Sequence, residues 1–287
     1  MSNVVAVALR ATEKASALHG NLRLVCTADP SRGTWLAEQS FSAPIHLSKT
    51  YWDGHTLLVN LVNQTAGIFG GDTIKTQVTV ELGARVLLSS PSAARFHTSR
   101  ERESRLEQNF VIRAGASLDV FPEISIPQRD SRSFQKTVIH VEPGGELLFL
   151  ETLAPGRVAS GESFAFTRYA WSTDIHLGNR SVHRERAAIT PGDSSLAGLT
   201  ALFPASYYAG LVLISPASEK WTTDFALAVA ALGSDSAKIA ASKLCAGGWS
   251  IRLLAADSLA LRQGIANLRD LIYKRLGHPL PNLRRSP

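Results

Sequence analysis

The segment Gly67-Ile68-Phe69-Gly70-Gly71-Asp72 is the first whose residue types suggest chemistry. Closely spaced glycines let backbone N–H groups approach a phosphate. However, the segment lacks the Gly-Lys-Ser/Thr ending of a nucleotide-binding loop, and a strand pattern rather than a helix follows it. We therefore expect a tight turn that fixes the position of Asp72, and no nucleotide site.

Other catalytic signatures are incomplete. The sequence has no Gly-x-Ser-x-Gly nucleophile motif, and Ser89-Ser90-Pro91-Ser92 has the small polar residues of a turn. The acids Glu123, Glu151 and Glu162 carry no glycosidase signature, although a carboxylate pair formed by the fold stays open. The residues therefore favour a binding or assembly role over an enzyme. A hydrolase whose site forms only in three dimensions is one alternative.

Candidate metal ligands are sparse. Asp174-x-His176 and His183-x-Glu185 each place two possible ligands on one face of a strand, a spacing that is common by chance. We interpret them as surface groups that are compatible with transient contact with a metal such as nickel. Cys26 and Cys245 lie far apart without a Cys-x-x-Cys pair, which predicts two buried, reduced thiols and no thiolate zinc site.

Composition narrows the class of protein. The chain has 287 residues with 45% hydrophobic content, enough for a sizeable core. It has neither an apolar stretch long enough for a membrane span nor a secretory apolar segment after Met1, so we expect a cytoplasmic protein. The formal charge of +6 comes from scattered basic residues, which favours a mixed surface over a nucleic-acid site. The basic tail 281–287, with Arg284-Arg285, predicts a partner contact or a role in solubility.

The candidate residues described above must be positioned by β-strands, because the strand pattern dominates the sequence. An alternation of residue types with period two, as in a strand, recurs from about residue 20 to 220. The clearest run places Ile74, Thr76, Val78 and Val80 on one side. A second run alternates from Leu106 to Ile112, and a third places Tyr169, Trp171, Thr173 and Ile175 on one side. The sequence therefore predicts a mainly β protein.

Three glycine turns repeat along this part of the chain. Gly83, Gly115 and Gly144 each follow one apolar strand and precede another, at intervals of roughly thirty residues. Such thin units must stack to bury a continuous core. We predict stacked, β-helical strand layers, with three ordinary hairpins in a sandwich as the alternative.

The pattern changes after residue 220. Thr222-Thr223 can cap an Ala-rich helix that ends by Gly233, and Asp257 can cap a second helix that stops at Gly277. The second helix has an apolar stripe, which is either core or a partner-binding face. The stripe comprises Leu261, Ile265, Leu268 and Ile272. We interpret residues 1–287 as one domain, with a mixed helical layer at about 221–280 on the strand layers.

Taken in chain order, the motifs resemble the urease accessory protein family UreD, also called UreH. The resemblance covers the chain from about Gly20 onward. The N-terminal motifs are Asn63 with Gly67, Gly70-Gly71-Asp72, Gly83-Ala84 and Ser89-Ser90-Pro91-Ser92-Ala93-Ala94-Arg95. The later motifs are Gly115-Ala116, Pro122-Glu123, Glu151, Gly156-Arg157, Gly161-Glu162, Glu185-Arg186, Gly247-Gly248-Trp249 through Arg252, and Arg269. Departures occur at Gln64-Thr65-Ala66, at Gln128-Arg129-Asp130 and in the tail at Leu283-Arg284-Arg285.

The resemblance implies a function in urease maturation. It implies a non-catalytic, β-stacked scaffold that bridges apo-urease to UreF and to the GTPase UreG, with nickel as a transient cargo and no permanently bound cofactor. It also implies an internal polar path for the ion, for which Asp72, Glu123 and Glu162 are our candidates by position in matching motifs. The stripe Leu261, Ile265, Leu268 and Ile272 is the candidate UreF-binding face. A metallochaperone that itself binds nickel is the alternative.

Overall fold

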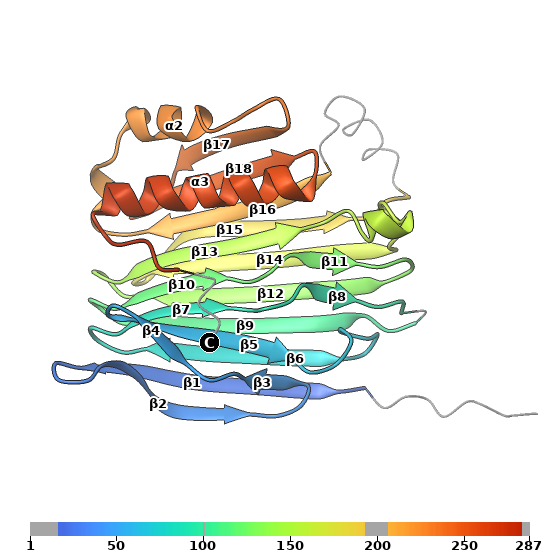
Figure 1. Cartoon of the computed structure of the whole chain (residues 1–287), viewed down its shortest axis with the longest axis horizontal. Helices are drawn as coiled ribbons and strands as arrows, with labels where there is room; N and C mark the ends of the chain where they lie inside the picture. The colour runs from blue at the N-terminus through green and yellow to red at the C-terminus, as the bar shows by residue number, and fades with distance from the viewer. Residues whose placement is uncertain (1–16, 100, 193–205, 283–287) are drawn as a thin grey trace, which may run out of the picture.

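The computed structural model describes residues 17–99, 101–192 and 206–282, and within them two sheets face each other in a stack of strands (Figure 1). The 7-stranded sheet, sheet A, runs in the order β15-β14-β12-β9-β6-β1-β2. Its strands are β1 (His19–Asp29), β2 (Gly33–Phe41), β6 (Thr73–Val80), β9 (Ser104–Ile112), β12 (Arg132–Val141), β14 (Arg168–Leu177) and β15 (Arg180–Ile189).

The 11-stranded sheet, sheet C, has the main path β17-β18-β16-β13-β10-β7-β5-β3. The strands of this path are β3 (Ile45–Leu47), β5 (Thr56–Asn63), β7 (Arg85–Ser89), β10 (Ser117–Phe121), β13 (Glu146–Leu153), β16 (Tyr207–Ile214), β17 (Ala237–Lys243) and β18 (Gly248–Ala255). Three short strands lie off it: β4 (Tyr51–Asp53), β8 (Ala94–Phe96) and β11 (Ser125–Pro127).

The stacking is parallel through the middle of both sheets. In sheet A, β1, β6, β9, β12 and β14 pair in parallel, and in sheet C β5, β7, β10 and β13 do the same. Parallel neighbours cannot be joined by tight hairpins, so the chain alternates between the sheets in a β-solenoid. The predicted β-helical stack is therefore confirmed, and the sandwich of three hairpins is wrong.

The repeated glycines make the turns between the sheets. Gly83, Gly115 and Gly144 have φ of +75°, +68° and +89°, a region in which a side chain would be strained. Each lies between a strand of sheet A and the next strand of sheet C. The inward residues of both sheets, such as Val78, Phe110 and Phe149, form the main core.

The C-terminal part extends sheet C with antiparallel strands and covers it with helices. Helix α2 (Thr223–Ala230) begins after Thr222 and is shorter than the predicted run to Gly233. Helix α3 (Ser258–Leu276) has the predicted caps, since Asp257 accepts the N–H of Ala260 at 2.8 Å and Gly277 is left-handed. Two 3-10 turns, η1 (Val158–Ser160) and η2 (Ser218–Lys220), complete the elements.

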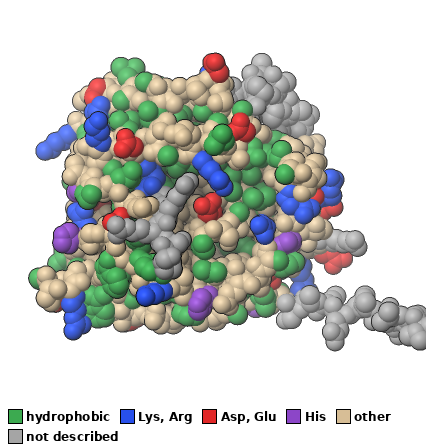
Figure 2. All heavy atoms as spheres, viewed as in Figure 1, with side chains coloured by type: hydrophobic (Ala, Val, Ile, Leu, Met, Phe, Trp, Pro, Cys, Tyr) green, Lys and Arg blue, Asp and Glu red, His purple; other side chains and the backbone are tan. Residues whose placement is uncertain are grey.

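Several surface predictions can be compared with the structure. On the face drawn in Figure 2, acidic and basic side chains are interspersed, as the sequence indicated. Cys26 is buried, which raises the pKa of its thiol to about 12, but Cys245 is exposed in the turn between β17 and β18. The prediction of two buried thiols is therefore wrong for Cys245. No helix in the described ranges has the length and apolar character to cross a membrane.

Candidate functional site

A cavity of about 190 Å³ lies between the two sheets. Residues from several separate sequence motifs line it, because the solenoid brings successive turns of chain to the same place. They are Asn63, Thr65–Gly67, Ser89, Ser90, Ser92–Arg95, Pro122, Glu123 and Glu151. Most of the remaining wall is apolar, as is usual for an internal binding cavity.

One face of the interior carries a polar column along sheet A. Thr76, Gln108, Thr137, Thr173 and Glu185 are direct register partners across the neighbouring strands β6, β9, β12, β14 and β15. Their positions face the core, where an apolar residue is the usual choice. Within the column, the hydroxyl of Thr137 donates to Oε1 of Gln108 at 3.0 Å. The column therefore forms a continuous line of hydrogen-bonding groups through the solenoid.

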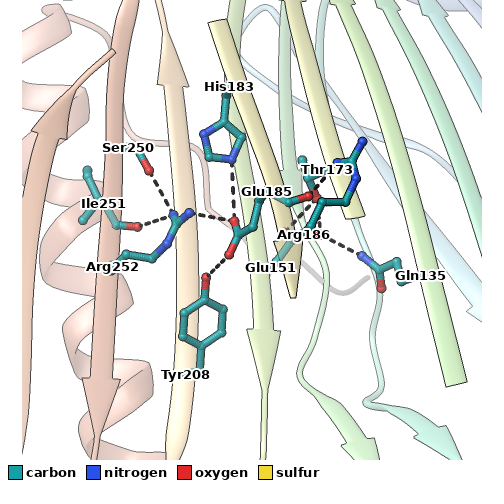
Figure 3. Close-up of polar contacts among 10 residues, drawn as sticks. All are labelled: Gln135, Glu151, Thr173, His183, Glu185, Arg186, Tyr208, Ser250, Ile251 and Arg252. Carbon is teal, nitrogen blue, oxygen red and sulfur yellow. Dashed lines mark hydrogen bonds and ion pairs between the residues drawn. The ribbon is translucent and has the colours of Figure 1, made fainter. Parts of the chain in front are cut away.

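Glu151 on β13 meets this column from the opposite sheet (Figure 3). Its Oε1 accepts hydrogen bonds from Thr173 Oγ1 and from Gln135 Nε2, both at 3.0 Å. Burial, followed by the negative charge of Glu185, raises the pKa of the Glu151 carboxyl to about 7, and the hydrogen bond from Thr173 opposes the shift. Glu151 is therefore a half-buried acid of the cavity wall whose pKa lies near neutral pH.

Glu185 lies at the end of the column, and its carboxylate has different contacts from that of Glu151 (Figure 3). The Tyr208 hydroxyl donates to its Oε1 at 3.1 Å, Arg252 Nη2 donates to its Oε2 at 2.6 Å, and His183 Nε2 lies 3.6 Å from Oε2. Burial raises the pKa of Glu185, but the contacts with His183, Arg252 and Tyr208 outweigh it, so the pKa is lowered overall. The interior thus pairs an ionised carboxylate with one that is close to half protonated.

Gly210 makes room for this cluster. It lies between Glu151 and Arg252 in the register of sheet C. A Cβ atom at this position would lie 2.6 Å from the Tyr208 hydroxyl and 3.3 Å from Arg252 Nη1. A larger residue would therefore push both side chains away from Glu185.

The three acids predicted for an ion path do not gather in one place. Glu123 is exposed and lines the cavity with Glu151. Asp72 is buried in the predicted tight turn, where it accepts the backbone N–H groups of Leu18 at 2.9 Å and Phe69 at 2.8 Å. It is not among the residues that line the cavity.

Glu162 is also separate from the cavity lining. Arg157 Nε donates to its Oε2 at 2.9 Å, and this contact holds the pKa of Glu162 below its ordinary value despite burial. Of the three acids, the structure therefore places only Glu123 beside the polar interior, and the path through all three stays a prediction.

The two short metal motifs have other contacts. Asp174 bonds Arg184 at 3.1 Å and Arg186 at 2.6 Å, and His176 stacks on His140 with ring centroids 4.9 Å apart. Across residues 17–99, 101–192 and 206–282, no group of three or more His, Cys, Asp or Glu is arranged to hold a metal ion.

The predicted partner-binding stripe on α3 faces the sheet. Leu261, Leu268 and Ile272 are 2%, 2% and 0% exposed, and Ile265 is partly buried against the same core cluster. They pack with residues of β16, β17 and β18. These side chains are therefore occupied by the core in this structure, and a partner that meets α3 would reach its outward face.

Sequence reasoning named Thr76, Thr173 and Glu185 but did not recognise that they form a polar column. Gln108 was left unassigned between the inward residues Leu106 and Phe110, and neither Thr137 nor Gln135, which donates to Glu151, was considered. A signal was present, because polar residues occupied inward positions of successive strands. Recognising it needed the register between strands, which the sequence alone does not state.

Comparison with known proteins agrees with the family resemblance that the sequence motifs indicated. A family model described as UreD urease accessory protein matches residues 18–286. A urease accessory protein UreD from Opitutus terrae is 36% identical over 273 residues, which cover 93% of this chain and 97% of the relative. The UreD of Acetivibrio thermocellus is 28% identical over 88% of this chain and 97% of its own. The UreD of Deinococcus radiodurans is 34% identical over 80% and 81%.

Proposed function

The chain belongs to the UreD urease accessory protein family, and from that premise we propose that it is a non-catalytic scaffold for nickel insertion into urease. In this role it bridges apo-urease to UreF and to the GTPase UreG in the cytoplasm. Nickel is its cargo, and no cofactor is resident. Membership of the family makes it a urease accessory protein with a part in urease maturation.

The convergence of distant motifs on one interior cavity carries this proposal. Asn63, Ser90, Arg95, Glu123 and Glu151 are spread over nearly ninety residues, yet all line the same space between the sheets. Stacking of the solenoid brings these positions together, and several of them carry polar or charged side chains where an apolar core residue would be usual. The meeting is expected if the motifs serve something that passes through the cavity.

The polar column supplies the chemistry that a divalent ion needs. An ion that leaves water for a protein interior must be met by charged or polar oxygens, because an unpaired charge there is very costly. Glu151 and Glu185 provide carboxylates, the Thr173 hydroxyl provides a neutral oxygen beside Glu151, and Gln108 adds an amide oxygen in the same column. Because Glu151 releases its proton near pH 7, it can exchange that proton for a metal ion.

The earlier candidates have unequal support in this proposal. Glu123 is suited to the mouth of the path, since it is exposed and lines the cavity. Asp72 and Glu162 are better explained as acceptors that hold their own turns in place. We therefore move the proposed path from Asp72 and Glu162 to Glu123 and Glu151, which line the cavity, and extend it to Glu185, which is outside the lining but is the register partner of Thr173.

UreF is proposed to contact the helical layer. The outward side of this layer exposes apolar side chains, since Leu227 on α2 is 67% exposed and Leu259 on α3 is 76% exposed. Such residues suit a partner interface, although isolated exposed leucines are also common. The net charge of +6 favours partners with acidic surfaces and an association that weakens with added salt.

Co-expression tests the scaffold role. The tagged chain is produced with the urease subunits, UreF and UreG, and the purified complex is assayed for its subunits, its nickel content and urease activity. The substitutions Glu151→Gln and Glu185→Gln should leave the subunits together while lowering the nickel content of urease. Glu38→Gln is the matched control, because that acid is exposed on β2 with a side chain 63% accessible.

A metallochaperone with its own tight nickel site is the alternative. Calorimetric titration of the isolated chain with nickel separates the two functions. The scaffold proposal expects weak or multiple binding. One strong, stoichiometric site that disappears in Glu151→Gln would favour the metallochaperone.

A further inference from the structure

A second, larger cleft of about 1140 Å³ lies on the outer face of sheet C, below the C-terminal end of α3. Its walls are the hairpin turns after β1 and after β4, the starts of β7, β10 and β13, and the segment that follows α3. Four carboxylates line it, from Asp29, Asp53, Asp119 and Glu146, against the two guanidinium groups of Arg32 and Arg85. We call it the acidic cleft. Its acidic side chains outnumber its arginines, whereas the whole protein has a net charge of +6.

Asp119 is the distinctive group in the acidic cleft. Its side chain is buried, with only 8% of the residue exposed, and it lines the cleft from β10. Among the described residues its carboxyl makes no hydrogen bond or ion pair. Burial raises its pKa to about 7, and the nearby charge of Arg269 only partly opposes this. A buried carboxyl in an open cleft without a donor suits a cationic hydrogen-bond donor from outside the described residues.

Arg269 acts on Asp119 only through its charge, because no hydrogen bond joins the two side chains and its buried Nε has no partner among the described residues. It lies over the rings of Phe121, 4.7 Å from the centroid, and Tyr273, 5.8 Å from the centroid. Its Nη2 donates to the carbonyl oxygen of Pro281 at 3.1 Å. Arg269 therefore anchors the segment after α3 to the edge of the cleft.

The chain after α3 turns back over the strands of sheet C (Figure 1) and contributes to the wall of the cleft. His278, Pro279, Leu280 and Pro281 line it, and the backbone N–H of Asn282 donates to Asp53 Oδ2 at 2.8 Å. Five residues follow, Leu283-Arg284-Arg285-Ser286-Pro287, which lie outside the described residues. When extended they can reach about 17 Å. The described chain therefore ends at Asn282 beside Asp53 in the wall of the cleft, and the length of the remaining five residues is sufficient to span it.

We propose that the acidic cleft binds the guanidinium groups of the chain's own Arg284 and Arg285, with Asp119 as the principal acceptor. Arginine suits this site because its planar donors bond carboxylates strongly. The bound tail ties the end of α3 to the β4 hairpin, which is 229 residues away in sequence at the bond between Asn282 and Asp53. The basic tail thereby gains an intramolecular role.

Limited trypsin digestion of the native full chain tests the proposal, because trypsin cuts after Arg284 and Arg285 and intact mass reports the loss of the last residues. We expect Asp119→Asn, which keeps the shape of the side chain, to speed this cleavage about tenfold, the factor expected from one charge-assisted hydrogen bond. Glu38→Gln removes an exposed acid that does not line the cleft, and this variant should be cleaved at the wild-type rate. Equal rates for wild type and Asp119→Asn would overturn the proposal.

A double-mutant cycle distinguishes the loss of this one contact from a general destabilisation of the fold. The pair Arg284→Gln and Arg285→Gln is introduced with and without Asp119→Asn, and the thermal midpoint of the full chain is measured. The tail substitutions should lower the midpoint only when Asp119 is present. Additive effects would contradict the proposal. So would binding of an added arginine-rich peptide that depends on Asp119 but not on the tail, since that would assign the cleft to a partner.

Discussion

Replacement of the half-buried acid Glu151 by glutamine should stabilise the protein while impairing nickel delivery. Glutamine has the same shape and keeps an oxygen that can accept the hydrogen bonds from Thr173 and Gln135. It cannot ionise, so it removes the cost of a charge in the interior. A residue that costs stability and yet is needed for activation is what a functional site predicts.

The magnitude follows from the pKa of Glu151. Burial raises the pKa from 4.5 to about 7, so the folded state keeps the proton after the unfolded state has lost it. Stability from this group is therefore complete below pH 4.5 and is lost as the pH rises to about 7. The full loss is roughly 3 kcal/mol at 1.36 kcal/mol per pKa unit.

Urea unfolding at two pH values measures this effect. Glu151→Gln should raise the unfolding free energy by less than about 1 kcal/mol at pH 5 and by roughly 3 kcal/mol at pH 8. Glu38→Gln, on the exposed face of β2, should show no comparable change between the two pH values. An effect of Glu151→Gln that is the same at both values would refute the assignment of Glu151 as an acid of the cavity wall that titrates near neutrality.

Three further substitutions test other parts of the account. Asp72→Ala should lower the unfolding free energy by about 2 kcal/mol, because two backbone N–H groups lose their acceptor; unchanged stability in urea with poor nickel loading would instead favour Asp72 as part of the ion path. Leu268→Asp should yield insoluble protein, since this side chain is 2% exposed in the core, whereas Leu259→Asp, at a position 76% exposed, should remain soluble on expression. Gly210→Ala should lower the thermal midpoint and the yield of active urease by displacing the groups around Glu185, while Gly192→Ala, where an added Cβ meets nothing within 4 Å, should do neither.

The fold was largely predictable from the sequence because its signals are local. The alternation around Val78 and the glycines at 83, 115 and 144 are properties of short segments, and they correctly indicated strands that stack through tight turns. The caps at Asp257 and Gly277 bounded α3 for the same reason. The family resemblance through Gly70-Gly71-Asp72 and later motifs was confirmed by the comparisons.

The site was less predictable because it depends on register. Gln108, Thr137 and Glu185 come from three strands, and only their pairing shows that they share a column with Thr173. Position in a motif also says little about direction, which is why Asp72 was proposed for a path although its carboxylate is bonded within its own turn. An apolar stripe likewise does not tell core from interface.

Nickel content of urease matured in the presence of Glu151→Gln is the most direct test of the central claim. The urease subunits, UreF and UreG are co-expressed with either the wild-type chain or the variant, and the complexes are compared for composition and for nickel per active site. The account predicts an intact complex whose urease contains clearly less nickel than with the wild-type chain. Full nickel content and activity with the variant would contradict the claim that the polar interior carries the ion.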